Sequence, residues 1–234
     1  MQKKKCTAIV LAAGQGKRMG TKVQKQYLEI QGKPVLYYSL NTFQQSDIID
    51  EIILVVGENQ EEYCKKEFVD KYHFTKVKKI VTGGSERYYS VWNGLKVTEE
   101  GYVFIHDGAR PFVTEDILER AYQLVLENKA CVVGMPVKDT IKIVNDTGYA
   151  IDTPNRNYVW TIQTPQVFET ELVKEAYSKI MKESNIIVTD DAMVVEQMLG
   201  IQVKLVTGTY ENIKITTPED ILIANQFVKH QMQV

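Results

Sequence analysis

Cysteine is scarce in this sequence, and its three copies follow no pairing pattern. Cys6, Cys64 and Cys131 lie far apart and form no C-x-x-C motif. Disulfide frameworks and structural zinc sites need closely spaced cysteines in matched sets. We therefore expect three reduced thiols, packed as small apolar side chains in an intracellular protein.

Long apolar runs are also missing. No segment approaches the roughly 18 consecutive apolar residues of a membrane helix, so we expect no membrane partner. The basic start at residues 1–5 precedes only a short apolar stretch, which leads into a glycine-rich loop that signal-peptide cleavage would remove. These features favour a cytoplasmic protein.

An excess of positive charge is the third absence. The 28 Lys and Arg residues are balanced by 30 Asp and Glu residues, which gives a formal net charge of -2 at pH 7. Domains that bind nucleic acid usually carry a basic excess on one face, so we expect no nucleic-acid partner. A local cluster of cations is still compatible with this balance.

Short apolar runs alternate with helical patterns along most of the chain. This alternation predicts an α/β fold, with a Rossmann-like, mostly parallel twisted sheet and helices on both faces. The length of 234 residues fits a single domain. The expected strands are 7–13, 51–57, 77–84, 102–111, 130–137, 202–208 and 211–217, and the expected helices are 34–45, 59–72, 85–97, 114–128, 171–183, 189–199 and a last one opening at Thr217 and Pro218.

The alternation is interrupted between residues 138 and 160. Polar and apolar residues alternate there around an Asn-Asp-Thr-Gly turn at 145–148, which predicts a protruding β-hairpin. A hairpin alone is only marginally stable, so this one should pack against something else. We predict that 138–160 is a β-arm through which the chain forms a homodimer.

A glycine-rich loop with two cations follows the first expected strand, at LAAGQGKRMG (11–20). A dinucleotide fingerprint needs a small residue where Met19 stands and an acidic residue about 20 positions on, and both are absent. A nucleoside-triphosphatase loop needs Ser or Thr in place of Arg18. What remains is a loop whose backbone N–H groups and cations can hold an anion, or else a surface turn with basic side chains.

Eight motifs, in order along the chain, resemble those of one enzyme family. They are LAAGQGKRM, KQYLEIQGKPVL, GGSERYYSV, HDGARPF, VKDTIK, QTPQVF, TDDA and NIKITTPED, and they span nearly all of residues 5–228. Together they resemble the 2-C-methyl-D-erythritol 4-phosphate cytidylyltransferases of non-mevalonate isoprenoid biosynthesis. The resemblance implies the nucleotidyltransferase fold, CTP and a sugar-alcohol phosphate as substrates, pyrophosphate as a product, and Mg²⁺ as cofactor.

The resemblance also implies a role for each residue that matches a family motif. Arg18, Lys25 and Lys214 match the catalytic cations that hold the phosphates. In the family, the residues that match Thr140 and Arg156 reach the site from the β-arm of the partner subunit. The implied nucleotide-binding residues are Ala12, Ala13, Gly14, Gly16, Gly83, Ser85, Ser90 and Asp107, with Asp107 also a metal ligand; the implied substrate-binding residues are Arg110, Thr140 and Arg156.

Cations suit this reaction better than a general base. The attacking phosphate is already anionic near neutral pH, so the obstacle is its repulsion from the triphosphate. Catalysis then depends on positioning and on stabilising charge in the transition state. A catalytic histidine is unnecessary, and we expect His106 to be structural.

Several alternatives stay open at this point. Ribitol-5-phosphate cytidylyltransferases share the fold and several motifs; the TPNR segment at 153–156 favours them, while LAAG and DGARP favour the methylerythritol enzymes. A nucleotide-binding module without catalysis, an NAD-dependent enzyme and a pure interaction protein are further possibilities. Gly108 and Gln24 depart from the alanine and proline usual in the methylerythritol family.

Other polar and aromatic residues have plainer interpretations. Asp190 and Asp191 stand where a helix begins, so capping accounts for both. Trp92 and Trp160 are expected to pack in the interior. Without the family resemblance, Lys214 would be a solvent-facing residue of a strand.

Overall fold

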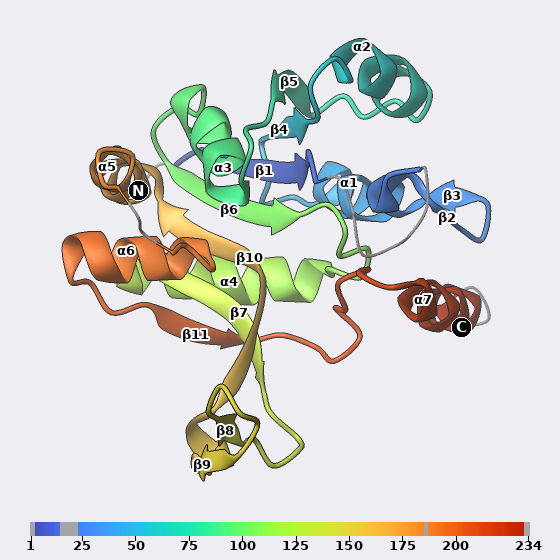
Figure 1. Ribbon diagram of the computed structural model, residues 1–234. Helices are drawn as coiled ribbons and strands as arrows, with labels where there is room; N and C mark the ends of the chain where they lie inside the picture. The colour runs from blue at the N-terminus through green and yellow to red at the C-terminus, as the bar shows by residue number, and fades with distance from the viewer. Residues whose placement is uncertain (1–2, 15–22, 185–186, 232–234) are drawn as a thin grey trace.

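The computed structural model describes residues 3–14, 23–184 and 187–231. Within them, seven strands form one sheet in the order β11-β7-β10-β6-β1-β4-β5 (Figure 1). All neighbours are parallel except β10, which runs antiparallel to β6 and β7. This confirms the predicted α/β class with a mostly parallel sheet. The strands are β1 (Cys6–Ala12), β4 (Glu51–Val56), β5 (Val77–Thr82), β6 (Tyr102–Asp107), β7 (Ala130–Pro136), β10 (Trp160–Glu169) and β11 (Lys204–Thr207).

Helices cover both faces of the sheet. Apolar side chains of α1 and α4 pack on one face, and those of α3, α5 and α6 pack on the other. The inner strands β1, β4 and β6 are buried along their length, as expected for strands covered on both sides. The helices are α1 (Val35–Gln45), α2 (Glu61–Cys64), α3 (Arg87–Lys96), α4 (Glu115–Asn128), α5 (Thr170–Ile180), α6 (Asp191–Leu199) and α7 (Pro218–Gln231).

Local signals account for several helix ends. The hydroxyl of Thr114 accepts a hydrogen bond from the Ile117 amide and caps α4, as the sequence predicted. Gly200 ends α6 in a left-handed conformation. Within the described residues, no helix combines the length and apolar character needed to cross a membrane.

Two segments differ from expectation. Residues 160–169 form β10, which the sequence did not reveal because Gln163, Thr164 and Gln166 are polar although they are buried in the sheet. The predicted strand at 211–217 is a loop that leaves the sheet after β11. Its alternating apolar pattern reflects packing against α7, since Ile215 is buried beside Val228.

The predicted helix at 59–72 is divided. It begins as α2 and continues as a short π-helix, η3 (Lys65–Asp70). Near the N-terminus, a 3-10 helix, η2 (Lys25–Tyr27), leads into a small hairpin of β2 (Glu29–Ile30) and β3 (Lys33–Pro34), which packs with α7.

The predicted arm is present as a projecting hairpin (Figure 1). Its strands, β8 (Ile143–Val144) and β9 (Ala150–Asp152), are exposed, and a 3-10 helix, η4 (Arg156–Tyr158), follows them. The Asn145 carboxamide accepts hydrogen bonds from the amides of Thr147 and Tyr149, and Gly148 has a φ of 85°. These local bonds account for the reversal of the chain at the end of the hairpin.

Candidate active site

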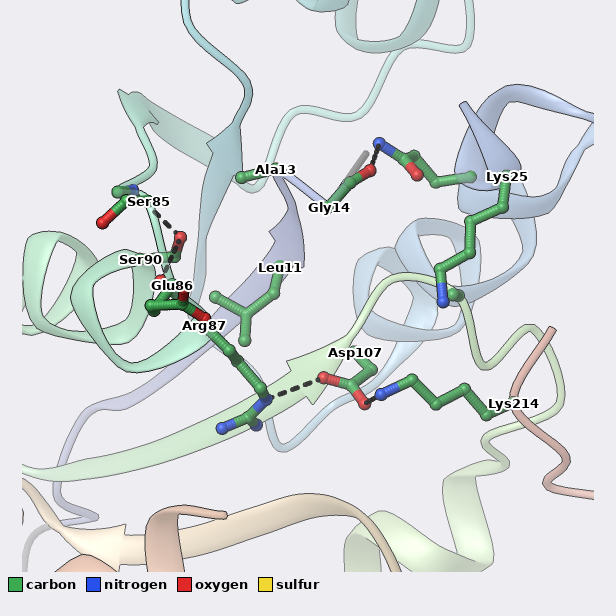
Figure 2. A pocket seen from close by; sticks show the side chains of 13 residues that line it. Leu11, Ala13, Gly14, Lys25, Ser85, Glu86, Arg87, Ser90, Asp107 and Lys214 are labelled. Atoms are coloured by element: carbon green, nitrogen blue, oxygen red, sulfur yellow. Dashed lines mark hydrogen bonds and ion pairs between the residues drawn. The ribbon is translucent and has the colours of Figure 1, made fainter. Parts of the chain in front are cut away.

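A pocket of about 530 Å³ opens at the carboxyl ends of β1 and β6 (Figure 2). Ligands of open α/β sheets bind at this edge, where loops from several parallel strands converge. Five separate parts of the chain build it: the end of β1, the helix η2, the segment around the start of α3, the end of β6 and the loop before α7. The lining residues are Leu11, Ala13, Gly14, Lys25, Gln26, Gly84, Ser85, Glu86, Arg87, Ser90, Asp107, Ala109 and Lys214.

The carboxylate of Asp107 lies between two cations on the pocket wall. Its Oδ2 atom is 2.7 Å from Nζ of Lys214, and its Oδ1 atom is 3.2 Å from Nε of Arg87 (Figure 2). Burial disfavours its charge, but Arg87 and Lys214 outweigh this effect and hold the pKa of the Asp107 carboxyl well below its usual range. The pocket therefore contains a fixed anion with a cation on either side.

Arg87 is held from behind by a second carboxylate. Its Nη1 and Nη2 atoms donate to the two oxygens of Asp191 at 2.8 and 2.7 Å. Asp191 is fully buried, and the Tyr177 hydroxyl also donates to it, at 2.5 Å. The sequence reasoning missed this group. Arg87 lies within the GGSERYYSV motif, between Ser85 and Ser90, and its place in that motif was the available signal.

The two aspartates at the start of α6 have different roles. Asp190 caps the helix, since its Oδ1 atom accepts from the Met193 amide at 2.9 Å, as predicted. Asp191 does not cap, and the capping interpretation was wrong for it, because its carboxylate is turned inward to Arg87. Sequence alone could not separate these neighbours, since only the packing of α6 on α5 decides which one is buried.

The start of the glycine loop is anchored to η2. The buried carboxamide of Gln26 donates to the carbonyls of Ala12 and Gly14, at 2.6 and 3.1 Å. Lys25, beside it, lines the pocket with Gly14 and Ala13. Gly16 and Arg18, also selected from the sequence, lie outside the described residues.

The segment 83–90 approaches the same loop closely. A Cβ atom on Gly83 would lie 2.4 Å from Cβ of Ala13, so only glycine allows this approach. The Ser90 hydroxyl accepts from the Gly84 amide at 3.0 Å, and Ser85 lines the pocket (Figure 2). The structure thus places seven of the residues that the family motifs predicted for the site around one pocket: Ala13, Gly14, Lys25, Ser85, Ser90, Asp107 and Lys214.

A second, smaller pocket of about 250 Å³ adjoins the first and shares Arg87, Asp107 and Lys214 with it. Arg110 lines this second pocket and donates to the carbonyls of Asn212 and Ile162, at 2.7 and 3.3 Å. The two pockets therefore meet at the Asp107 cluster, an arrangement that can hold two reactants side by side.

Three other selected groups lie apart from these pockets or behind them. Thr140 and Arg156 are exposed in the arm and line neither pocket. His106 is buried, with its ring nitrogens within hydrogen-bond distance of the Thr164 hydroxyl and the Arg110 carbonyl. Burial lowers its pKa to about 4, which is consistent with the predicted structural role.

Residues 6–230 match the family model for 2-C-methyl-D-erythritol 4-phosphate cytidylyltransferase, IspD. The chain belongs to this family. Its similarity to curated IspD relatives covers nearly the whole length of both partners. A relative from Lachnospira eligens is 51% identical over 95% of this chain and 99% of its own length, and one from Caldanaerobacter subterraneus subsp. tengcongensis is 48% identical over 95% and 98%.

Solved IspD-family structures share the fold. A crystal structure of the 4-diphosphocytidyl-2C-methyl-D-erythritol synthase from Anaerococcus prevotii superposes with a TM-score of 0.86, at 38% identity over 97% of this chain and 96% of that one. The 2-C-methyl-D-erythritol 4-phosphate cytidylyltransferase from Thermus thermophilus gives a TM-score of 0.77, at 27% identity over 94% and 98%. These names support the methylerythritol interpretation of the sequence motifs and give no support to the ribitol-phosphate alternative.

Proposed function

We propose that this protein joins CTP to 2-C-methyl-D-erythritol 4-phosphate, releasing pyrophosphate and 4-diphosphocytidyl-2-C-methyl-D-erythritol. The observation that carries the proposal is the match of residues 6–230 to the family named for this reaction. The convergence of Lys25, Lys214 and Asp107 at one pocket supports it. In the reaction, a phosphate oxygen of the sugar-alcohol phosphate bonds to the α-phosphorus of CTP as the bond to the β-phosphate oxygen breaks.

The large pocket is proposed to hold CTP. The backbone at Ala13 and Gly14, the two serines at 85 and 90 and the ammonium of Lys25 offer donors for phosphate and ribose oxygens. Lys25 and Lys214 would stabilise the charge that spreads over the transition state and the leaving pyrophosphate. Arg18, from the motif LAAGQGKRM, is proposed as a third cation.

Arg110 is proposed to bind the sugar-alcohol phosphate in the smaller pocket. This places the attacking phosphate next to the Asp107 cluster, where the two pockets meet. Both substrates are anions, so their approach requires cations on either side of the reacting phosphorus. The geometry favours positioning and charge stabilisation over proton transfer.

Asp107 is the proposed protein ligand of Mg²⁺. Among the described residues, no group of three or more His, Cys, Asp and Glu side chains could hold a metal ion by itself. Mg²⁺ commonly binds through substrate phosphates and only one or two carboxylates, so the carboxylate of Asp107 can be sufficient as a protein ligand. When bound there, the ion would neutralise charge on the triphosphate.

The exposed arm supports a homodimer as part of the proposal. Tyr149 and Tyr158 are 74% and 85% exposed, and Val144 and Ile151 are exposed beside them. A second copy of the chain would cover these side chains and would bring Thr140 and Arg156 to the pocket of its partner. The chain would then act as a single nucleotidyltransferase domain whose arm at 138–160 completes the neighbouring site.

A two-substrate assay tests the proposed function. Purified protein is incubated with CTP, Mg²⁺ and either 2-C-methyl-D-erythritol 4-phosphate or ribitol 5-phosphate, and pyrophosphate release is measured. We expect turnover with the methylerythritol compound and at most a small rate with ribitol 5-phosphate. Preference for ribitol 5-phosphate, or no turnover with either, would refute the proposal.

A further inference from the structure

Arg87 occupies the boundary between the two pockets and lines both of them. Its guanidinium joins two carboxylates: Nε faces Asp107 in front, and both Nη atoms face Asp191 behind. No role was assigned to Arg87 from the family resemblance. Of the residues lining the large pocket, only Arg87, Asp107 and Lys214 also line the smaller one.

The orientation of Arg87 is set by rigid surroundings. Asp191 is the first residue of α6, and Tyr177 of α5 donates to the same carboxylate. The Tyr177 ring in turn stacks with Trp92 of α3, with ring centroids 6.3 Å apart and an interplanar angle of 8°. Because the guanidinium is planar, a carboxylate that binds Nη1 and Nη2 also fixes the direction of the Nε–H bond. In Arg87 this bond points at Asp107.

Lys214 faces a conflict that Arg87 can resolve. In the structure its ammonium is 2.7 Å from Asp107, yet the proposed function requires it to contact the phosphates of CTP. If it leaves Asp107 before a metal ion is bound there, the carboxylate of a residue that is 8% exposed loses a counter-charge. A buried charge without a partner is strongly unfavourable, so without a second cation the carboxylate would retain Lys214.

We propose that Arg87 is a positioning residue that keeps Asp107 fixed and charge-compensated, so that Lys214 is released to the phosphates of the nucleotide. The inference rests on the proposed function for the identity of the nucleotide. The hydrogen bonds of Asp191 to Arg87, and of Tyr177 to Asp191, keep the guanidinium beside Asp107 when the phosphates bind. Arg87 thereby acts through Asp107 and Lys214.

A purely structural role must be separated from this one. Removing Arg87 alone would leave Asp191 buried without its partner and could unfold the protein. We therefore compare the double variant Arg87→Met/Asp191→Asn with the single variant Asp191→Asn. The single variant keeps the arginine, and the amide oxygen of Asn at 191 can still accept one of its hydrogen bonds, so it is the matched control. Thermal unfolding checks that both variants are folded.

CTP binding in metal-free buffer, measured by calorimetry, is the main readout. We expect the double variant to bind CTP at least about tenfold more weakly than Asp191→Asn, because Asp107 then holds Lys214. Adding Asp107→Asn to the double variant should restore most of the lost affinity, since no carboxylate is left to compete for Lys214. A structural defect would not be repaired by a further substitution.

Two results would overturn the inference: equal CTP affinity of the double variant and its control, or no recovery on adding Asp107→Asn. The wild-type protein is assayed in parallel for pyrophosphate release from CTP and methylerythritol phosphate. If the wild type releases no pyrophosphate but the variants show the expected CTP affinities, the proposed reaction alone is refuted. If the wild type is active but the variants do not show these affinities, only the role of Arg87 is refuted.

Discussion

The large pocket and the arm at 138–160 differ in how much of their structure this chain supplies. In the pocket, Asp107 has cationic partners on both oxygens, and Arg87 is anchored in the interior by Asp191. Toward its tip, the arm is held by local contacts such as the turn bonds of Asn145 and a 2.7 Å bond from the Lys142 ammonium to the Thr153 hydroxyl. At its base, the Lys138 ammonium lies 3.5 Å from the centroid of the Tyr210 ring. The described pocket walls come from this one chain, whereas the arm leaves apolar side chains uncovered.

This difference is what the proposed homodimer would require. Charged groups in the pocket neutralise each other across distant parts of the chain, so the wall can form before any ligand arrives. Large exposed aromatic side chains gathered on one projection are instead typical of an interaction surface. Substitutions in the pocket should therefore act within one protomer, and substitutions in the arm should act on the neighbouring one.

The largest effect is expected from Lys214→Ala. Removing a donor that stabilises transition-state charge typically costs about 2.7–4 kcal/mol, so kcat/KM for pyrophosphate release should fall about 100- to 1000-fold. Lys204→Ala, at an exposed position of β11, is the control and should keep wild-type kinetics. Comparable rates for the two variants would remove Lys214 from the proposed mechanism.

A mixing experiment tests whether the arm serves its neighbour. Arg156→Ala should raise the KM for the sugar-alcohol phosphate about tenfold or more, with CTP binding unchanged. When Arg156→Ala and Lys214→Ala protomers are mixed and allowed to exchange, half of the dimers are mixed, and each of these has one intact site. Activity should then recover to about one quarter of wild type; no recovery after exchange would show that each arm serves its own pocket.

The buried His106 behind the pocket makes stability depend on pH. Burial lowers its folded-state pKa from 6.5 to about 4, so below pH 6.5 the unfolded chain takes up a proton that the folded chain does not. The free energy of unfolding should fall by about 2 kcal/mol from this group between pH 7.5 and 5. Denaturant titrations should show this slope in the wild type and a flatter one in His106→Gln. Equal slopes would exclude His106 as the cause.

The smallest effect is expected at the turn of the arm. Gly148 has a φ of 85°, and a Cβ atom added there would meet nothing within 4 Å, so Gly148→Ala strains the backbone by about 1 kcal/mol without a clash. Because the strands of the hairpin are exposed, the melting temperature of the core should stay the same. Sedimentation should show a dimer whose dissociation constant rises a few-fold. A matching loss of core stability would mean that the arm and the sheet unfold together.

Some local features were readable from the residues alone. The strands β1, β4 and β6 contain continuous apolar runs that are buried on both sides. Such runs are typical of the central strands of a parallel sheet. The Thr114 cap, the Gly200 helix end and the turn at 145–148 depend on contacts within a few residues. The roles of Lys25, Asp107 and Lys214 came from the family motifs, and the structure adds that these three residues share one pocket.

Tertiary structure alone decided the rest. In the polar strand β10, the buried Gln166 carboxamide oxygen accepts hydrogen bonds from the amides of Asp191 and Ala192 at the start of α6. A partner so far along the chain cannot be predicted from the local sequence pattern. The two hydrogen bonds between Arg87 and Asp191 likewise join residues far apart in the chain. Short-range propensity and burial of apolar surface determine strands, caps and turns, but the pairing of buried polar groups depends on which distant segments the finished fold places in contact.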